Sequence, residues 1–340
     1  MNKPTGIERV AYELCRGLQR KGVDFSIVCS GSGKIYEEYD LSSLNVVRYS
    51  CGFSHFWEQI ILPFFFLFKR NYLLMCFSGL GPIGVKNKVL TIHDLSFLVN
   101  PAWFSKSYYW FYKLLTPLSA LSSIHIITVS NFSKEEILHH YTFLNKDKIS
   151  VVYNAAKIPI DKINIEKSKE EKAFFLVVAS FDPRKNIEIA IEAMKDNKDY
   201  SLTVVGNPHR AFREVELSQN ENINYIGRLT FNEVVKLYAK AKAFIFPSLY
   251  EGFGLPAIEA MQMGCIVIAS DIPVFHEVCG NAAVFFNPKD IESLKDAIKK
   301  VSSMSEEEKQ DLIEKGAQNV KRFSWDKSAD KLFQIISSLS

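Results

Sequence analysis

The chain has 340 residues, 47% of them hydrophobic, which is too long for one typical core and predicts two α/β domains of roughly 150 residues each. Its 41 Lys and Arg residues against 38 Asp and Glu give a net charge of only +3, mixed along the sequence, which excludes an electrostatic case for nucleic-acid binding. The six cysteines form no Cys-x-x-Cys pair and follow no secretory signal, which indicates a reducing, cytoplasmic setting without disulfides or a zinc site.

The first predicted element is a helix that ends near Gly22. Its apolar face consists of Ile7, Val10, Leu14 and Leu18. A strand is predicted next, over residues 23–29. A doubly wound domain normally begins with a strand ahead of its first glycine turn, and the four residues before Thr5 cannot supply one. We therefore expect the first strand of this domain to be missing, because of either a start site placed too late or an impaired protein.

The segment from residue 46 to residue 85 is rich in aromatic side chains, and its most apolar run extends from Ile60 to Phe68. This run is far shorter than the roughly 20 apolar residues that a membrane span needs. Two interpretations stay open: a buried helix, or an interfacial patch whose basic neighbours Lys69 and Arg70 reach toward headgroups. We favour the buried helix, because apolar stretches more often belong to a core.

The segment Gly79–Gly84 spells Gly-x-Gly-x-x-Gly, the letters of a dinucleotide-binding turn. That turn must follow a strand and open a helix. Here Pro82 lies inside the segment and the next predicted element, over residues 88–92, is a strand. We therefore interpret the segment as a plain loop.

His93 and Asp94 follow a short buried strand at residues 89–92. Open α/β sheets place their ligand residues at the carboxyl ends of strands, which makes His93 a candidate for function. A lone histidine is more often structural, so the sequence position by itself leaves its role open.

The rest of the first domain alternates helices and strands. We predict an aromatic helical region over residues 103–121 that breaks at Pro117, and a strand over residues 124–129. Ser133 and Glu136 have the spacing of a capping box that would start the next helix. The strand at residues 151–154 closes this domain.

The second domain follows a polar and charged segment, residues 157–172, which we predict to be the linker. A strand at 174–179 leads into a loop that carries Arg184 and Lys185. Cations in such a strand-to-helix loop can neutralise phosphate oxygens, although a solvated basic pair is the simpler interpretation of the spacing alone. Further predicted elements are strands at 202–205 and 223–226, a helix capped by Thr230 and Glu233, two helices within 290–321, and an amphipathic terminal helix after Trp325.

Residues 243–271 form the most informative stretch. An apolar strand, 243–246, leads through a glycine-bearing loop to Pro256, which suits the start of a helix because proline needs no N–H partner there. The helix ends near Gly264 and a second buried strand follows, so the stretch predicts a βαβ unit. The free N–H groups and dipole of such a helix N-terminus favour a phosphate. Glu251 and Glu259 flank this position.

Within this stretch, residues 247–260 (Pro-Ser-Leu-Tyr-Glu-Gly-Phe-Gly-Leu-Pro-Ala-Ile-Glu-Ala) resemble the Glu-x7-Glu signature of retaining glycosyltransferases of family 4, also called group 1. The resemblance extends over nearly the whole chain and is strongest to the branch that builds bacterial surface polysaccharides. It is carried in order by Thr5–Arg9, Trp57–Gln59 with Pro63, Thr91–Leu95, Thr128–Ser133, Pro183–Asn186, Ser270–Pro273 with Glu277, and Phe323–Trp325. The family implies the GT-B fold, in which two Rossmann-like domains face each other across the active-site cleft.

The resemblance also assigns roles to single residues. It implies that Glu259 binds the ribose hydroxyls of the nucleotide and that Glu251 binds the donor sugar near the reacting carbon. Charge-assisted hydrogen bonds from hydroxyls to carboxylates agree with both roles. The residues at the diphosphate would be Phe253, Gly254 and Leu255 through their backbone amides, Arg184 and Lys185 through their charges, and Gly6 through a close backbone approach. His93 would approach the donor sugar opposite Glu251.

The resemblance implies a metal-independent enzyme without a cofactor. The sequence contains no Asp-x-Asp, the motif by which single-domain glycosyltransferases hold Mg²⁺ or Mn²⁺, and cationic side chains would replace the metal. The implied reaction moves a hexose-type sugar from a nucleotide-diphosphate donor to an acceptor hydroxyl, on a growing lipid-linked saccharide. The implied location is the cytoplasm, with peripheral contact to the inner membrane.

Two other functions stay open on the sequence. The same fold could serve a sugar-nucleotide epimerase, or a catalytically inactive subunit that binds nucleotide sugars. The predicted domains are residues 1–156 on the acceptor side, 173–322 for the nucleotide sugar, and a terminal helix at 323–340 that we expect to pack back on the first domain.

Overall fold

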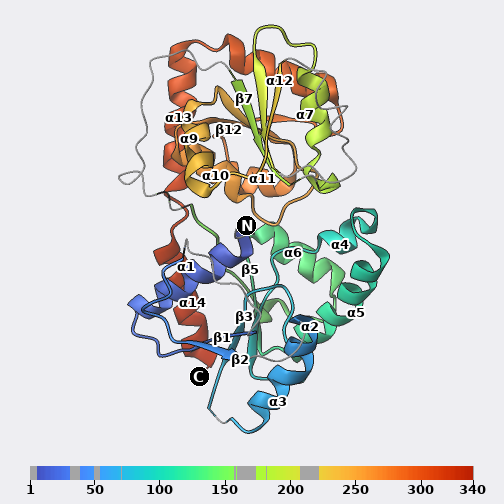
Figure 1. Cartoon of the computed structure of the whole chain (residues 1–340), viewed down its shortest axis with the longest axis vertical. Coiled ribbons are helices and arrows are strands. Elements are labelled where there is room, and N and C mark those ends of the chain that lie inside the picture. Colours follow the sequence, from blue (N-terminus) through green and yellow to red (C-terminus); the bar gives the residue numbers. More distant parts are fainter. Residues whose placement is uncertain are drawn as a thin grey trace. The chain divides into compact units, whose positions relative to one another are not determined.

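The computed structural model describes residues 6–30, 39–49, 54–69, 71–156, 158, 174–180, 182–206 and 222–339. The chain forms two compact units (Figure 1): unit 1 comprises Met1–Asn154 with Trp325–Ser340, and unit 2 comprises Ala155–Ser324. The predicted linker at 157–172 lies outside the described residues, apart from Ile158. Residues 1–5, where the first strand is expected to be missing, also lie outside them.

Unit 2 is built on one parallel sheet of six strands in the order β12-β11-β10-β7-β8-β9. The strands are β7 (Phe174–Val178), β8 (Ser201–Val205), β9 (Ile223–Ile226), β10 (Ala243–Phe246), β11 (Ile266–Ser270) and β12 (Ala283–Phe286). The central strands are short apolar runs, and all of β10 and β11 is buried, as expected for a parallel sheet that helices cover on both faces. The strand order changes direction between β7 and β10. Strands β8 and β9 follow on one side of β7, whereas β10, β11 and β12 follow on the other.

Helices cover both faces of this sheet, with α7 and α12 on one side and α9, α10 and α13 on the other (Figure 1). They are α7 (Ile187–Met194), α9 (Phe231–Lys240), α10 (Leu255–Gln262), α11 (Pro273–Cys279), α12 (Ile291–Ser303) and α13 (Glu306–Val320), with a 3-10 turn, η5 (Pro183–Lys185). The predicted capping box of α9 is confirmed, since the Thr230 side chain accepts from the Glu233 amide and the Glu233 carboxylate accepts from the Thr230 amide. The two helices predicted within residues 290–321 are confirmed as α12 and α13.

The described strands of unit 1 form two separate parallel sheets. One has two strands, β1 (Ile27–Ser30) and β2 (Val46–Tyr49). The other has the order β3-β4-β5-β6, with β3 (Leu74–Cys76), β4 (Lys88–Thr91), β5 (His125–Thr128) and β6 (Ile149–Val151). All four residues of β4 are buried, so the predicted strand ahead of His93 is confirmed as a central strand.

The helices of unit 1 correct two of the predictions. They are α1 (Gly6–Arg20), α2 (Ser54–Phe56), η1 (Trp57–Ile61), α3 (Leu62–Leu67), α4 (Ser96–Val99), η2 (Pro101–Trp103), α5 (Lys106–Ser122), α6 (Asn131–His140), η3 (Lys146–Lys148) and α14 (Trp325–Leu339). Pro117 does not break its helix: α5 continues past it, because burial of neighbouring side chains outweighs the one backbone hydrogen bond that proline removes. The predicted cap at Ser133 is also wrong, since Ser130 caps α6 by accepting from the Ser133 amide.

The apolar run from Ile60 to Phe68 is helical, but it is buried on one side only. Leu62 and Phe66 pack into a small core with Trp57 and Val85, whereas Phe64 and Phe68 are exposed over 67% and 78% of their surface. The predicted buried helix is therefore found for one face of the segment only, and the other face is exposed. The short helix can turn only about a third of its circumference toward the core that it covers.

The terminal helix α14 packs on α1 within unit 1. Gly17 makes this close crossing possible, because a Cβ placed there would lie 2.4 Å from the Ala329 Cβ. An ion pair between Arg20 and Asp326 at 2.8 Å and a hydrogen bond from Ser328 Oγ to the Tyr153 carbonyl at 2.6 Å add polar contacts. The last helix thus belongs to the first unit, although the whole of unit 2 separates them in sequence.

Candidate functional site

The candidate site of unit 2 lies where its sheet changes direction, between β7 and β10. In open parallel sheets the loops at the carboxyl ends of two such strands diverge to opposite faces and leave room for a ligand between them. The loop after β7 carries Arg184 and Lys185, and the loop after β10 carries Glu251. Strand order therefore brings together residues that are 66 positions apart in sequence.

The loop after β7 is fixed by its own polar side chains. Asp182 caps the turn η5 by accepting from the Arg184 amide at 2.9 Å, and Pro183 occupies the first turn position, where no N–H is needed. Asn186 then takes a left-handed conformation, with φ of 52°. Its side-chain amide donates to the carbonyls of Pro247 at 3.1 Å and Pro288 at 2.8 Å. The amide thereby ties the loop to the ends of β10 and β12.

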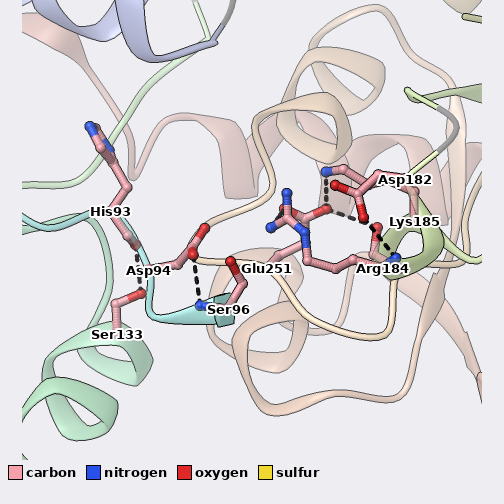
Figure 2. Close-up of polar contacts among 9 residues, drawn as sticks. His93, Asp94, Ser96, Ser133, Asp182, Arg184, Lys185 and Glu251 are labelled. Carbon is pink, nitrogen blue, oxygen red and sulfur yellow. Dashed lines mark hydrogen bonds and ion pairs between the residues drawn. The ribbon is translucent and has the colours of Figure 1, made fainter. Parts of the chain in front are cut away.

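Arg184 and Lys185 point toward Glu251 (Figure 2). Lys185 Nζ lies 2.5 Å from Glu251 Oε1 and Arg184 Nη1 lies 3.7 Å from Oε2. Ser248 Oγ donates to the same Oε1 at 2.8 Å. These side chains are only 10% to 16% exposed, so the ion pairs are weakly screened by water. Two cations against one carboxylate leave a net positive charge of +1.

The loop after β10 ends in a backbone conformation that requires glycine. Gly254 caps α10 with φ of 103°, and a Cβ at this position would lie 2.8 Å from Phe275 Cε1 and 3.3 Å from Phe246 Cε1. Both the dihedral and the aromatic walls exclude other residues. Pro256 has no N–H and the Ala257 amide donates to the Gly254 carbonyl at 3.0 Å, so the Leu255 amide is the helix-start donor that follows directly after the Glu251 loop.

The remaining predicted residues of unit 2 lie at the same place. Glu259 is buried on α10, one turn after its start, with 8% of its surface exposed. Phe253 is also buried and meets the Phe323 ring edge-on, with centroids 5.3 Å apart. Unit 2 therefore brings together Arg184, Lys185, Glu251, Phe253, Gly254, Leu255 and Glu259, all within two loops and one helix start.

His93 belongs to unit 1, where it follows β4. Its Nε2 lies 2.7 Å from the Phe77 carbonyl, and since a carbonyl only accepts, Nε2 carries the proton and Nδ1 keeps its lone pair. Ser133 Oγ donates to the His93 carbonyl at 3.1 Å, and Figure 2 shows Ser133 supporting this backbone. Burial lowers the pKa of His93, against the opposing effects of the Phe77 hydrogen bond and the Asp94 charge. The imidazole is therefore neutral at pH 7.

Asp94, which follows His93, and Gly6, the last of the predicted site residues, also lie in unit 1. Asp94 accepts from the Ser96 amide at 2.9 Å and so fixes the turn into α4. Gly6 is the exposed first residue of α1, also in unit 1. Within the part of the chain that the structure describes, no three His, Cys, Asp or Glu side chains gather as metal ligands.

Comparison with known proteins places the chain in a family. Residues 160–319 match the profile of Glycosyl transferases group 1, and residues 4–157 match that of Glycosyltransferase Family 4. An O-antigen chain mannosyltransferase of Salmonella typhimurium, RfbU, is 35% identical over 262 residues, which cover 75% of this chain and 71% of that protein. The chain belongs to the group 1 glycosyltransferases. It is therefore a glycosyltransferase enzyme, as its motifs predicted.

Other similar proteins agree with this assignment. O-antigen chain mannosyltransferase B of Escherichia coli is 28% identical to this glycosyltransferase over 270 residues, covering 72% of the chain and 68% of that protein. Among solved structures, the Anabaena protein HepE, in complex with UDP and glucose, superposes with a TM-score of 0.74 at 14% identity, covering 99% of this chain and 97% of that one. At that identity the likeness shows the fold alone. The predicted two-domain α/β fold of the GT-B type is confirmed.

Sequence reasoning missed the residues that hold the charged side chains of this glycosyltransferase in place. Ser248 contacts Glu251, Asp182 caps the turn of Arg184, and Asn186 anchors that turn to two other strands. Asp182 could have been found, because Asp followed by Pro is a signal for a capped turn. The partners of Asn186 could not, since backbone carbonyls after β10 and β12 leave no mark in the sequence.

Proposed function

We propose that this glycosyltransferase moves a hexose-type sugar, of the mannosyl class, from a nucleotide-diphosphate donor to a saccharide hydroxyl with retention of anomeric configuration. The observation that carries the proposal is the buried cluster of Lys185 and Arg184 on Glu251 beside the start of α10. The names of its O-antigen chain mannosyltransferase relatives support the sugar class. We propose in addition that the acceptor is a lipid-linked saccharide in surface polysaccharide synthesis.

The chemistry of the leaving group explains the need for this cluster. Breaking the bond between the sugar and the diphosphate leaves negative charge on phosphate oxygens, and fixed cations in a water-poor site stabilise that charge without reorganising. Lys185, Arg184 and the amides at Gly254 and Leu255 supply the positive side. We propose that they replace a divalent metal, so that transfer persists in excess EDTA.

The two acids take the hydroxyl groups of the donor. Glu251 is held in place by Ser248 and the two cations, which leaves a carboxylate of defined orientation for the sugar hydroxyls. Glu259 lies one turn into α10, where a buried carboxylate can accept two hydrogen bonds from vicinal ribose hydroxyls. We include the neutral His93 as a hydrogen-bonding group for the donor sugar and Gly6 as a close backbone approach to the phosphates.

The test is a donor panel with the purified full chain. GDP-mannose and other nucleotide-diphosphate sugars are incubated with lipid-linked saccharide extracted from bacterial membranes, and the product is analysed by NMR. We expect transfer from one donor class with the anomeric configuration of that donor, with and without EDTA. An inverted product, or EDTA-sensitive transfer, would contradict the corresponding part of the proposal.

The same assay separates the two other functions that the sequence left open. Free epimer formed without acceptor would indicate an epimerase. Tight donor binding without any transfer or epimer would indicate a binding subunit. Glu251→Ala should abolish transfer while the folded variant still binds nucleoside diphosphate, which distinguishes a role in chemistry from a role in binding the nucleotide.

A further inference from the structure

Unit 1 carries two rows of exposed apolar side chains on neighbouring helical segments. The first stripe runs along α2, η1 and α3, and the second stripe runs along α5. Their members are Phe56, Ile60, Phe64, Leu67 and Phe68 in the first stripe, and Trp110, Leu114, Leu118 and Leu121 in the second. Each is exposed over 48% to 78% of its surface. An apolar surface of this kind on a soluble domain usually marks an interaction site.

The spacing shows that each stripe is one helical face. Apart from the adjacent pair Leu67 and Phe68 at the end of the first stripe, successive members are three or four residues apart, the interval at which side chains line up along a helix. His55 of α2 meets the rings of Phe111 and Tyr112 of α5 at 4.6 Å and 6.2 Å, so the two segments are neighbours. Figure 1 shows α2, α3 and α5 along the same part of unit 1.

The charge of this region identifies the partner. From residue 59 to residue 134 the sequence has seven Lys and Arg residues and a single acid, Asp94. Of these, Lys88 is fully buried and its pKa is lowered to about 8 by burial, whereas Lys69, Lys106 and Lys113, which lie on or next to the two stripes, are exposed. Neither α3 nor α5 contains an acidic residue, and Glu58, between Phe56 and Ile60, is only 17% exposed. An anionic surface complements this region.

Lysines next to the stripes lie over aromatic rings, an arrangement that suits a lipid headgroup layer. Lys69 Nζ lies 4.9 Å from the ring centre of Phe65, and Lys113 Nζ lies 4.9 Å from that of Trp110. Their aliphatic stems thus extend along aromatic rings, which suits side chains that bury their carbons and keep the charge near water. Lys148 adds a charge at the end of α5, where it donates to the Leu121 carbonyl at 3.0 Å.

We propose that the two stripes dock unit 1 on a bilayer that contains anionic lipids, with Phe, Trp and Leu side chains in the headgroup boundary and the lysines at the phosphates. The proposed contact is peripheral. The described helices include none that is both long and apolar enough to cross a membrane. The inference extends the proposed lipid-linked acceptor, because docking would hold the enzyme at the surface that carries it.

The test uses vesicles that contain neither donor nor acceptor. The full chain is sedimented with vesicles of phosphatidylcholine alone or with one third phosphatidylglycerol. We expect binding to the anionic vesicles, reduced in 0.5 M salt because charged surfaces are screened. Lys113→Gln should weaken binding about fivefold, and only on anionic vesicles.

The stripe variants are Phe64→Ser with Phe68→Ser, and Trp110→Ser with Leu114→Ser. Each pair should lower the partition coefficient at least tenfold, since the transfer of two large apolar side chains is lost. The matched control is Phe143→Ser with Phe333→Ser, two exposed apolar residues of unit 1 outside the stripes. The control pair should stay within twofold of the wild type.

A measurement on the unaltered chain avoids any dependence on variants. Trp110 is 54% exposed, whereas Trp57 and Trp325 are buried, so brominated lipids should quench part of the tryptophan fluorescence, and Trp110→Phe should remove most of that quenching. Absence of vesicle binding, or equal binding to both vesicle types, overturns the proposal. So does a dimer in sedimentation velocity that both stripe variants dissolve, since the stripes would then join two copies. Loss of sugar transfer with intact vesicle binding would count against the proposed function alone.

Discussion

The two units treat their buried ionisable groups in opposite ways. In unit 2, Glu251 is buried against Lys185 and Arg184, so opposite charges compensate one another. In unit 1, burial without a strong partner moves the groups toward their neutral forms. The pKa of Glu58 rises to about 7, that of Lys88 falls to about 8, and that of His93 is lowered.

This difference determines which interactions the ionisable groups of each unit can make. A paired site holds its cations in place, and they can stabilise a phosphate without reorganising. A site of neutral groups contributes hydrogen bonds, and its properties change with pH because small shifts alter its protonation. Substitutions that break the pairing in unit 2 should therefore have larger effects than substitutions of the buried groups of unit 1.

The largest effect is expected from Lys185→Met. Loss of this cation leaves Glu251 buried without its closest partner, and we expect unfolding free energy to fall by about 3 kcal/mol and sugar transfer to fall by 10²-fold to 10³-fold, on the order of removing one preorganised donor. Chemical denaturation and initial rates measure the two effects.

A double variant separates stability from function. Lys185→Met with Glu251→Leu removes both charges, so most of the lost stability should return while transfer stays absent. If the double variant regains transfer, the pair is structural and the proposed role of Lys185 is wrong. The exposed Lys195→Met serves as the control for loss of a lysine.

Gly254→Ala tests whether the start of α10 depends on backbone geometry. Alanine is strained at φ of 103°, and its Cβ would meet Phe275 at 2.8 Å, so we expect a loss of about 3 kcal/mol in unfolding free energy. Gly227→Ala is the matched control, because nothing lies within 4 Å of a Cβ there. Equal melting temperatures for the two variants would contradict the packing described.

Glu58→Gln tests the neutral character of unit 1. Burial raises the pKa of this carboxyl to about 7, above its value in the unfolded chain, so its contribution to stability is complete below about pH 4.5 and is lost as pH rises through 7. At pH 8 the wild type must hold a buried charge, and the amide should be more stable by roughly 2 kcal/mol. Denaturation at pH 5 and pH 8 measures this, with the exposed Glu135→Gln as control. A difference that does not grow with pH would count against the effect of burial.

The same contrast determines what the sequence could predict. The site of unit 2 was predictable, because Glu251, Gly254 and Glu259 lie in one short segment whose strand, turn and helix follow from local signals. Lys185 joins them through strand order, which the alternation of elements also predicts. The exposure of Phe64 and Phe68 was not predictable, since a run of apolar residues does not reveal which side of its helix finds a core.

The pair of wrong predictions in unit 1 has a common cause. Ser130 and Ser133 both have the residue type of a helix cap, and only tertiary contacts decide between them. Ser133 is buried and used by the His93 carbonyl, which leaves Ser130 to cap the helix. Pro117 likewise stays inside α5 because packing outweighs local preference. Where local signals compete, the sequence names the candidates and the fold selects one.

Ser133→Ala removes the hydrogen bond to the His93 carbonyl and is expected to have the smallest effect. The hydroxyl holds the His93 carbonyl at 3.1 Å, and the loss of one neutral hydrogen bond, about 1 kcal/mol, should lower kcat about fivefold with KM unchanged. Ser150→Ala removes a similar serine contact, to His125 at 3.0 Å, and is the matched control.

The pH profile shows whether that contact acts through His93. Because burial lowers the pKa of the imidazole, the neutral form persists below pH 6.5, and the transfer rate should begin to fall only at more acidic pH. His93→Gln should remove this acidic decline along with most of the activity, since the amide cannot take up the proton. Ser133→Ala loosens the backbone but leaves the Phe77 carbonyl on Nε2, so it should lower the plateau without moving the decline. An unchanged profile in His93→Gln would assign the decline to another group and restrict His93 to a structural role beside β4.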